Sequence, residues 1–151
     1  MTTSSNKDKG EEKKFRVGLN GIYFEILVYS NLNALYKEAN RWAKSTKREE
    51  SDLTDSLALV QPFEKFIVLK DGKEKTYPEV GKVRFSKSNI SPHIVSHEVV
   101  HMAMWFFRLS NDNGKADFGN ENSQSEEDFA DIYCRLFRKM SIKLYQYGFW
   151  K

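Results

Sequence analysis

The spacing of apolar residues along the chain predicts a small α+β domain. Apolar and polar residues alternate before residue 30 and again over 57–86, which predicts strands, whereas apolar spacings of three and four predict a helix over about 31–45. Asn20-Gly21 and Asp71-Gly72 each separate two strand segments, and both dipeptides suit the positive φ angles of a tight hairpin turn. The expected sheet is therefore small, twisted and mostly antiparallel, and the helix covers one of its faces.

Two further helices are predicted in the second half of the chain. Ser91 and Pro92 suit the N-cap and the first helical position of a strongly apolar run that extends to about residue 107. The last helix is expected to begin after Ser125, a candidate N-cap, and to end at about residue 144. Its apolar stripe consists of Phe129, Ile132, Tyr133, Leu136, Phe137 and Met140.

The segment 80–86 leads directly into the first of these two helices. Val83 and Phe85 alternate with polar neighbours, which is typical of a half-buried or edge strand. An edge strand leaves backbone hydrogen-bonding groups unpaired, so Lys82–Ser86 could pair with an extended peptide by strand addition.

The helix after this strand contains His97-Glu98-Val99-Val100-His101, a pattern in which one helix offers two imidazoles and one carboxylate to a zinc ion. At about 3.6 residues per turn, positions four apart lie one above the other, so His97 and His101 can converge on one metal. Glu98 lies beside them and is not needed as a ligand, which suits a general base that takes a proton from zinc-bound water. The alternative is a core helix with two incidental histidines, but burying these polar groups without partners would be costly.

A catalytic zinc usually has three protein ligands, so one more ligand is needed. His93 is the only other histidine in the chain. Along one helix it would lie about 12 Å from His101, too far for both to bind one ion. His93 is therefore expected at the start of the helix or at the rim of the site, and the third ligand is expected to be a carboxylate.

Acids in the polar stretch 111–124, namely Asp112, Asp117 and Glu121, are hard to hold rigidly, which leaves those of the last helix. Glu127 and Asp131 stack one turn apart. They share a side with the small residues Ala130 and Cys134, which would let this helix approach the histidine helix closely. One of the two acids could bind the metal while the other accepts a hydrogen bond from a ligating histidine. The alternative is that both belong to a solvated acidic face.

The histidine motif followed by Glu127-Asp128-Phe129-Ala130-Asp131-Ile132-Tyr133 resembles the gluzincins, the thermolysin-like branch of the zincin metallopeptidases. The resemblance covers roughly residues 80–136 and implies a zincin-like α+β fold with an HExxH active-site helix and a C-terminal glutamate helix. It also implies that His97, His101 and Glu127 hold one Zn²⁺ per chain, that Glu98 is the general base, and that Asp131 supports the third ligand. The short chain is similar to minimal zincin domains of phage and small bacterial proteins.

Two features depart from the family pattern. The Tyr or His that stabilises the oxyanion in gluzincins has no direct match, although Tyr77, Arg84 and Tyr133 are candidate oxyanion or substrate contacts. At this length a second domain that would complete a deep cleft is not expected. Metal binding is therefore better supported by the sequence than peptide hydrolysis.

Composition limits the alternatives. Residues 1–13 are polar and aperiodic, which predicts a disordered tail before a single domain over 14–151. The net charge of +3 arises from intermixed charges, so it gives no electrostatic case for nucleic acid. The single cysteine, Cys134, excludes an internal disulfide and fits a reducing compartment. No segment resembles a membrane span or an export signal, so a cytoplasmic location is expected, in the host cytoplasm if the chain is phage-encoded.

The expected function is zinc-dependent hydrolysis of peptide bonds in a protein or peptide substrate. The alternative is a zincin-fold binding module, a phage or defence-related factor, that keeps a structural zinc and acts by binding a partner protein. Glu98 argues against this module because metal binding alone does not require that carboxylate. A weaker third hypothesis is a nucleic-acid-associated protein that uses Lys82, Arg84 and Lys87.

Overall fold

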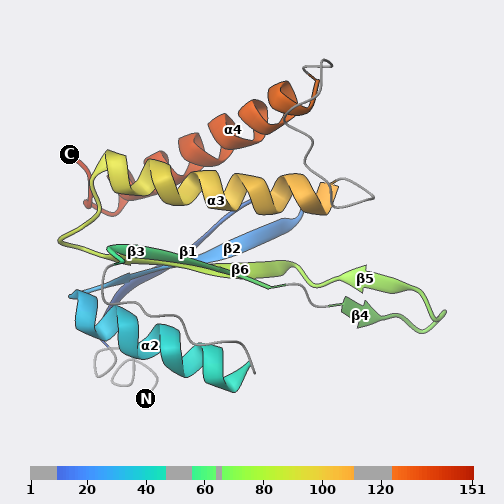
Figure 1. The fold of residues 1–151 in the computed structure, drawn as a ribbon, viewed down its shortest axis with the longest axis horizontal. Coiled ribbons are helices and arrows are strands. Elements are labelled where there is room, and N and C mark those ends of the chain that lie inside the picture. Colours follow the sequence, from blue (N-terminus) through green and yellow to red (C-terminus); the bar gives the residue numbers. More distant parts are fainter. Residues whose placement is uncertain (1–9, 47–55, 64–65, 111–123) are drawn as a thin grey trace.

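The computed structural model describes residues 10–46, 56–63, 66–110 and 124–151, and it shows an α+β fold with helices on both faces of a small mixed sheet (Figure 1). In chain order the elements are β1 (Glu11–Leu19), β2 (Ile22–Tyr29), α2 (Leu32–Ser45), β3 (Ala58–Pro62), β4 (Phe66–Val68), β5 (Glu74–Thr76), β6 (Glu79–Ser86), α3 (Pro92–Ser110) and α4 (Gln124–Gln146). Because β1 begins at Glu11, residues 11–13 belong to the sheet and not to the predicted tail, while residues 1–9 lie outside the described part.

Both predicted hairpins are confirmed. Asn20 and Gly21 have φ angles of 55° and 83°, and they join β1 to β2 in an antiparallel pair. Gly72, with a φ of 83°, lies in the turn between β4 and β5, which form a separate two-stranded ribbon. This ribbon extends away from the helices and the main sheet (Figure 1).

The main sheet has the strand order β1-β2-β6-β3, so the prediction that Lys82–Ser86 forms an edge strand is wrong. Strand β6 pairs in parallel with β2 and antiparallel with β3, and Val83 is opposite both Ile26 and Val60. Apolar and polar residues alternate along β6 because its two faces differ. Val83 and Phe85 belong to the apolar core, whereas Arg84 belongs to a polar network on the opposite face. The edge of the sheet next to α3 is β3.

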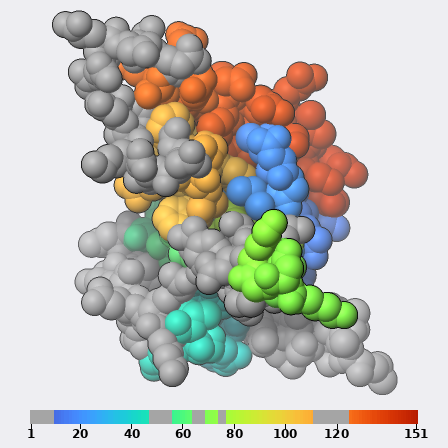
Figure 2. All heavy atoms as spheres, turned by 90° about the vertical axis from the view of Figure 1, so that its right-hand side faces the viewer, coloured from blue at the N-terminus to red at the C-terminus, as the bar shows by residue number. Residues whose placement is uncertain are grey.

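The helices form a layer on each side of the sheet. Helix α2 covers one face, and α3 and α4 cover the other (Figures 1 and 2). The α2 helix confirms the prediction for residues 31–45, and its N-cap Asn31 accepts a hydrogen bond from the backbone N–H of Ala34 at 2.9 Å. No helix in the described part of the chain has both the length and the apolar character needed to cross a membrane.

Helix α3 packs against both the sheet and α4. It begins at Pro92 as predicted, and its start is held by a hydrogen bond of 2.6 Å from Trp150 Nε1 to the carbonyl of Ile90. Helix α4 already includes Gln124, so Ser125 lies inside the helix and is not its N-cap. The buried apolar side of α3 consists of Val95, Val99, Met102, Ala103, Phe106 and Phe107.

The close approach of β2, β6 and β3 predicts that Gly81→Ala destabilises the fold. A Cβ at Gly81 would lie 2.4 Å from Cε1 of Phe24 and 2.7 Å from the backbone oxygen of Gln61. We expect a loss of roughly 1–3 kcal/mol in the free energy of unfolding, measured by urea denaturation.

The matched control is Gly21→Ala, because a Cβ at Gly21 meets nothing within 4 Å and only the positive φ opposes it. This variant should lose less than Gly81→Ala. Equal losses in the two variants would show that the packing around Gly81 is looser than described.

Candidate functional site

Helix α3 and the edge strand β3 enclose a cleft of about 510 Å³. His97, Glu98 and His101 all line it from the helix, and Ala58, Leu59 and Val60 line it from the strand. A neighbouring hollow of about 320 Å³ extends along the start of α3, and the exposed His93 lies on its wall. The structure therefore brings the three residues of the histidine motif together at one surface.

The two imidazoles of the motif converge. The Nε2 atoms of His97 and His101 are 3.3 Å apart, and the ring centroids are 5.0 Å apart. Two nitrogens that each lie about 2.0–2.1 Å from a tetrahedral zinc would be separated by roughly 3.3–3.4 Å. A hydrogen bond between the rings accounts for the same distance in a metal-free protein, so the separation fits a metal and does not require one.

Glu98 is almost completely enclosed, with 7% of its surface exposed. Burial raises the pKa of its carboxyl to about 7, because the charged form loses contact with water. A carboxyl with this pKa can exchange a proton near neutral pH, as a general base or acid must. Glu98 therefore combines a place in the cleft with the protonation behaviour that the sequence pattern requires.

The protonation of His101 also suits a metal ligand. Its pKa is lowered, first by burial and second by the charge of His97. A lowered pKa keeps the imidazole neutral, and only the neutral ring has a lone pair to offer to a metal.

The two acids expected to complete the site lie elsewhere. Glu127 and Asp131 are exposed on α4, neither lines the cleft, and the Asp131 carboxylate pairs with Arg135 at 3.9 Å. Ala130 and Cys134, the small residues expected to face α3, are exposed as well. Within the described ranges, no group of three or more His, Cys, Asp or Glu side chains could hold a metal ion. The other acids considered, Asp112, Asp117 and Glu121, lie outside the described residues.

The three candidate oxyanion contacts are not brought to the cleft either. The Tyr133 hydroxyl hydrogen-bonds with Ser96 and so joins α4 to α3. Arg84 is buried on the α2 side of the sheet, and Tyr77 precedes β6 without lining the cleft.

The sequence reasoning missed the rest of the cleft wall. Met104, Trp105 and Arg108 line it beyond His101. Met104 and Arg108 continue the spacing of four, three and four that begins at His97, so the helical repeat could have identified them. The opposite wall, formed by β3, could not be identified in this way because the order of strands in a sheet depends on pairings distant in sequence.

The chain matches no protein-family model, no curated protein and no solved structure. The likeness to gluzincins therefore rests on the sequence motifs alone. The fold is established only as α+β with a mixed sheet.

The raised pKa of Glu98 predicts a pH-dependent gain of stability in Glu98→Gln. In the folded protein the pKa is about 7, compared with an ordinary value of 4.5 that applies to the unfolded chain. Ionisation therefore opposes folding: the cost is absent below the unfolded pKa, grows as the pH rises and is complete above the folded pKa. In chelator-treated protein, Glu98→Gln should be more stable than the parent by roughly 1–3 kcal/mol at pH 8 and nearly unchanged at pH 4.5.

Urea denaturation at both pH values measures this difference. The control is Glu126→Gln, which removes an exposed carboxylate of α4. A gain at pH 8 that is no larger for Glu98→Gln than for Glu126→Gln would contradict the burial of the Glu98 charge.

Proposed function

We propose that the chain is a zinc-dependent, gluzincin-like peptidase whose metal is held by His97 and His101 and whose general base is Glu98. One observation carries the proposal: the two Nε2 atoms are 3.3 Å apart, at the separation that a shared zinc requires, next to a buried carboxyl. The cleft between α3 and β3 supports it, because a reacting peptide needs a concave site beside these groups.

The two histidines are suitable zinc ligands, and a third ligand is still needed. Both are imidazoles on one helix face, and the lowered pKa of His101 favours the neutral ring that binds metal. When bound, zinc would polarise a carbonyl and acidify a water molecule. The third ligand is proposed to be a carboxylate, and Glu127 is the candidate from the family resemblance. Because Glu127 does not line the cleft and forms no three-residue metal group with the histidines among the described residues, the first turn of α4 must move for Glu127 to ligate.

Proton transfer and substrate binding are assigned to other parts of the chain. Glu98 accepts a proton at its carboxylate oxygen and can return it to a leaving amine, because its pKa lies near the working pH. Strand β3 pairs with β6 on one side only among the described strands, so its other edge offers backbone N–H and C=O groups. An extended peptide could add to this edge and lie in the cleft beside α3.

A second candidate function is a zincin-fold binding module that acts by binding a partner protein. The exposure of Glu127 favours it, because the described residues supply two ligands and a catalytic zinc usually takes three. The burial of Glu98 favours the peptidase, since a binding module gains nothing from an enclosed carboxyl.

The proposed site predicts near-stoichiometric zinc. The purified protein should hold about one zinc per chain, and His97→Ala or His101→Ala should abolish tight binding because each removes half of the described donor set. Elemental analysis and competition with a chromophoric chelator measure this, with circular dichroism as a check on folding. The matched control is His93→Ala, which removes an exposed histidine of the same helix and should keep the metal.

The same measurement tests the third ligand. Glu127→Ala should lose tight zinc binding if α4 reorients as proposed, while Glu126→Ala should not. If Glu127→Ala binds zinc like the parent, and Glu126→Ala or Glu121→Ala does not, the assignment of Glu127 is wrong.

The assignment of Glu98 predicts a separation of binding from catalysis. Glu98→Gln keeps the size of the side chain but cannot accept a proton, so peptide hydrolysis should fall by about 10²–10⁴-fold while zinc content and folding are retained. Cleavage of a peptide library, with and without a chelator, measures the loss. Undiminished hydrolysis by Glu98→Gln at normal zinc content would contradict the proposed peptidase mechanism.

A further inference from the structure

A second cavity lies on the opposite face of the sheet from the histidine cleft. It has a volume of about 330 Å³ and is lined by residues of β1, β2, β6 and α2. This volume is large enough for a small molecule. Its cationic and aromatic lining consists of Lys14, Tyr29, Arg41, Trp42, Lys82 and Arg84.

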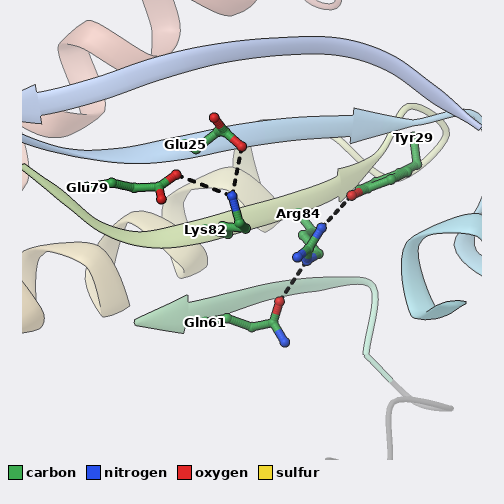
Figure 3. A network of polar contacts seen from close by, with 6 residues as sticks. All are labelled: Glu25, Tyr29, Gln61, Glu79, Lys82 and Arg84. Carbon is green, nitrogen blue, oxygen red and sulfur yellow. Dashed lines mark hydrogen bonds and ion pairs between the residues drawn. The ribbon is translucent and has the colours of Figure 1, made fainter. Parts of the chain in front are cut away.

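Arg84 is the unusual residue of this cavity. Only 3% of its surface is exposed, so its charge is removed from water. Its NH1 group donates to the Tyr29 hydroxyl, and its Nε donates to Oε1 of Gln61 at 2.7 Å (Figure 3). Both acceptors are uncharged, because the Gln61 amide does not ionise and burial raises the pKa of Tyr29 to about 12.

Two of the other cations around the cavity, Lys82 and Arg41, have carboxylate partners. The Nζ of Lys82 lies 2.8 Å from Glu25 and 3.2 Å from Glu79, as Figure 3 shows, and Arg41 pairs with Glu38 at 3.4 Å. Arg84 makes no ion pair with any carboxylate of the described residues.

A buried charge is costly unless an opposite charge compensates it, and Arg84 lacks that compensation within the described protein. The two hydrogen bonds also use only part of the N–H donors of the guanidinium. The planar fork of a guanidinium matches carboxylate and phosphate groups, which accept two parallel hydrogen bonds. An oxyanion in the cavity would therefore supply an opposite charge and accept hydrogen bonds from the N–H groups that these two bonds leave unused.

We propose that this cavity binds a small molecule through an oxyanion, a carboxylate or a phosphate group, held by Arg84. The lining carries the cations Lys14, Arg41, Lys82 and Arg84 against the acids Glu11 and Glu38, so its formal charge is positive even though Arg41 and Glu38 pair with each other. Trp42 provides an aromatic surface, with its ring centroid 5.9 Å from the guanidinium carbon of Arg84. The site is independent of the proposed zinc site, because the sheet separates the two.

Calorimetric titration with inorganic phosphate and, separately, with acetate tests the site, at constant ionic strength balanced with chloride. The parent should bind at least one of the two anions saturably and with a raised Tm. Saturation by phosphate alone identifies a phosphate site, saturation by acetate alone identifies a carboxylate site, and saturation by both identifies a general oxyanion site. Arg84→Gln should weaken the binding at least tenfold.

Two further variants keep the test decisive if Arg84→Gln does not fold. Lys14 is exposed and Arg41 has a half-exposed side chain, so the double variant Lys14→Gln/Arg41→Gln should fold and bind severalfold more weakly. Arg135→Gln, which removes an exposed cation of α4, should bind like the parent. The proposal is overturned if neither anion binds saturably to the parent, or if the cavity variants bind as tightly as Arg135→Gln.

Discussion

The packing of α3 against the sheet is the constraint on which the candidate site depends. Val95, Val99 and Met102 are fully buried, and together with Phe106 they fix the rotation of the helix about its axis. The ring of Phe106 lies 5.7 Å from that of Phe24, which in turn fills the space left by the missing side chain of Gly81. Because its apolar side is fixed in this way, α3 directs His97 and His101 towards β3 and encloses Glu98 between the helix and the strand.

Local sequence patterns predicted much of the fold and the part of the site that lies on α3. The Asn20-Gly21 turn, the α2 helix and the start of α3 follow from short-range rules, and the structure agrees with each of them. The convergence of His97 and His101 follows from helical geometry alone. The predictions that were wrong concern features that depend on contacts distant in sequence. The alternation of apolar and polar residues along β6 could not distinguish an edge strand from an internal strand with one apolar and one polar face. For α4, the side with Glu127 was expected to face α3, but the wide aromatic stripe buries more apolar surface and turns the acids outward.

The two faces of the sheet are connected through β3, the strand that forms one wall of the histidine cleft. Gln61, in β3, accepts a hydrogen bond from Arg84 and donates one from Nε2 to the carbonyl of Ala39 in α2 at 3.2 Å. The edge strand is therefore held from behind by a polar network while its residues Ala58 and Val60 face the cleft. Burying the charge of Arg84 beside neutral partners destabilises the fold. An anionic ligand would offset this loss, which agrees with the proposal that the cavity binds an oxyanion.

The central claim is that His97 and His101 share one zinc ion, and an anomalous difference map from a zinc-soaked crystal tests it most directly. The account predicts a single strong peak at the zinc absorption edge, about 2.0–2.1 Å from both Nε2 atoms, with a carboxylate and a water completing the coordination. The ordinary electron-density map of the same crystal would identify the residue that supplies an oxygen ligand. A zinc peak bound elsewhere on the chain, with the two imidazoles still joined by a hydrogen bond, would contradict the account.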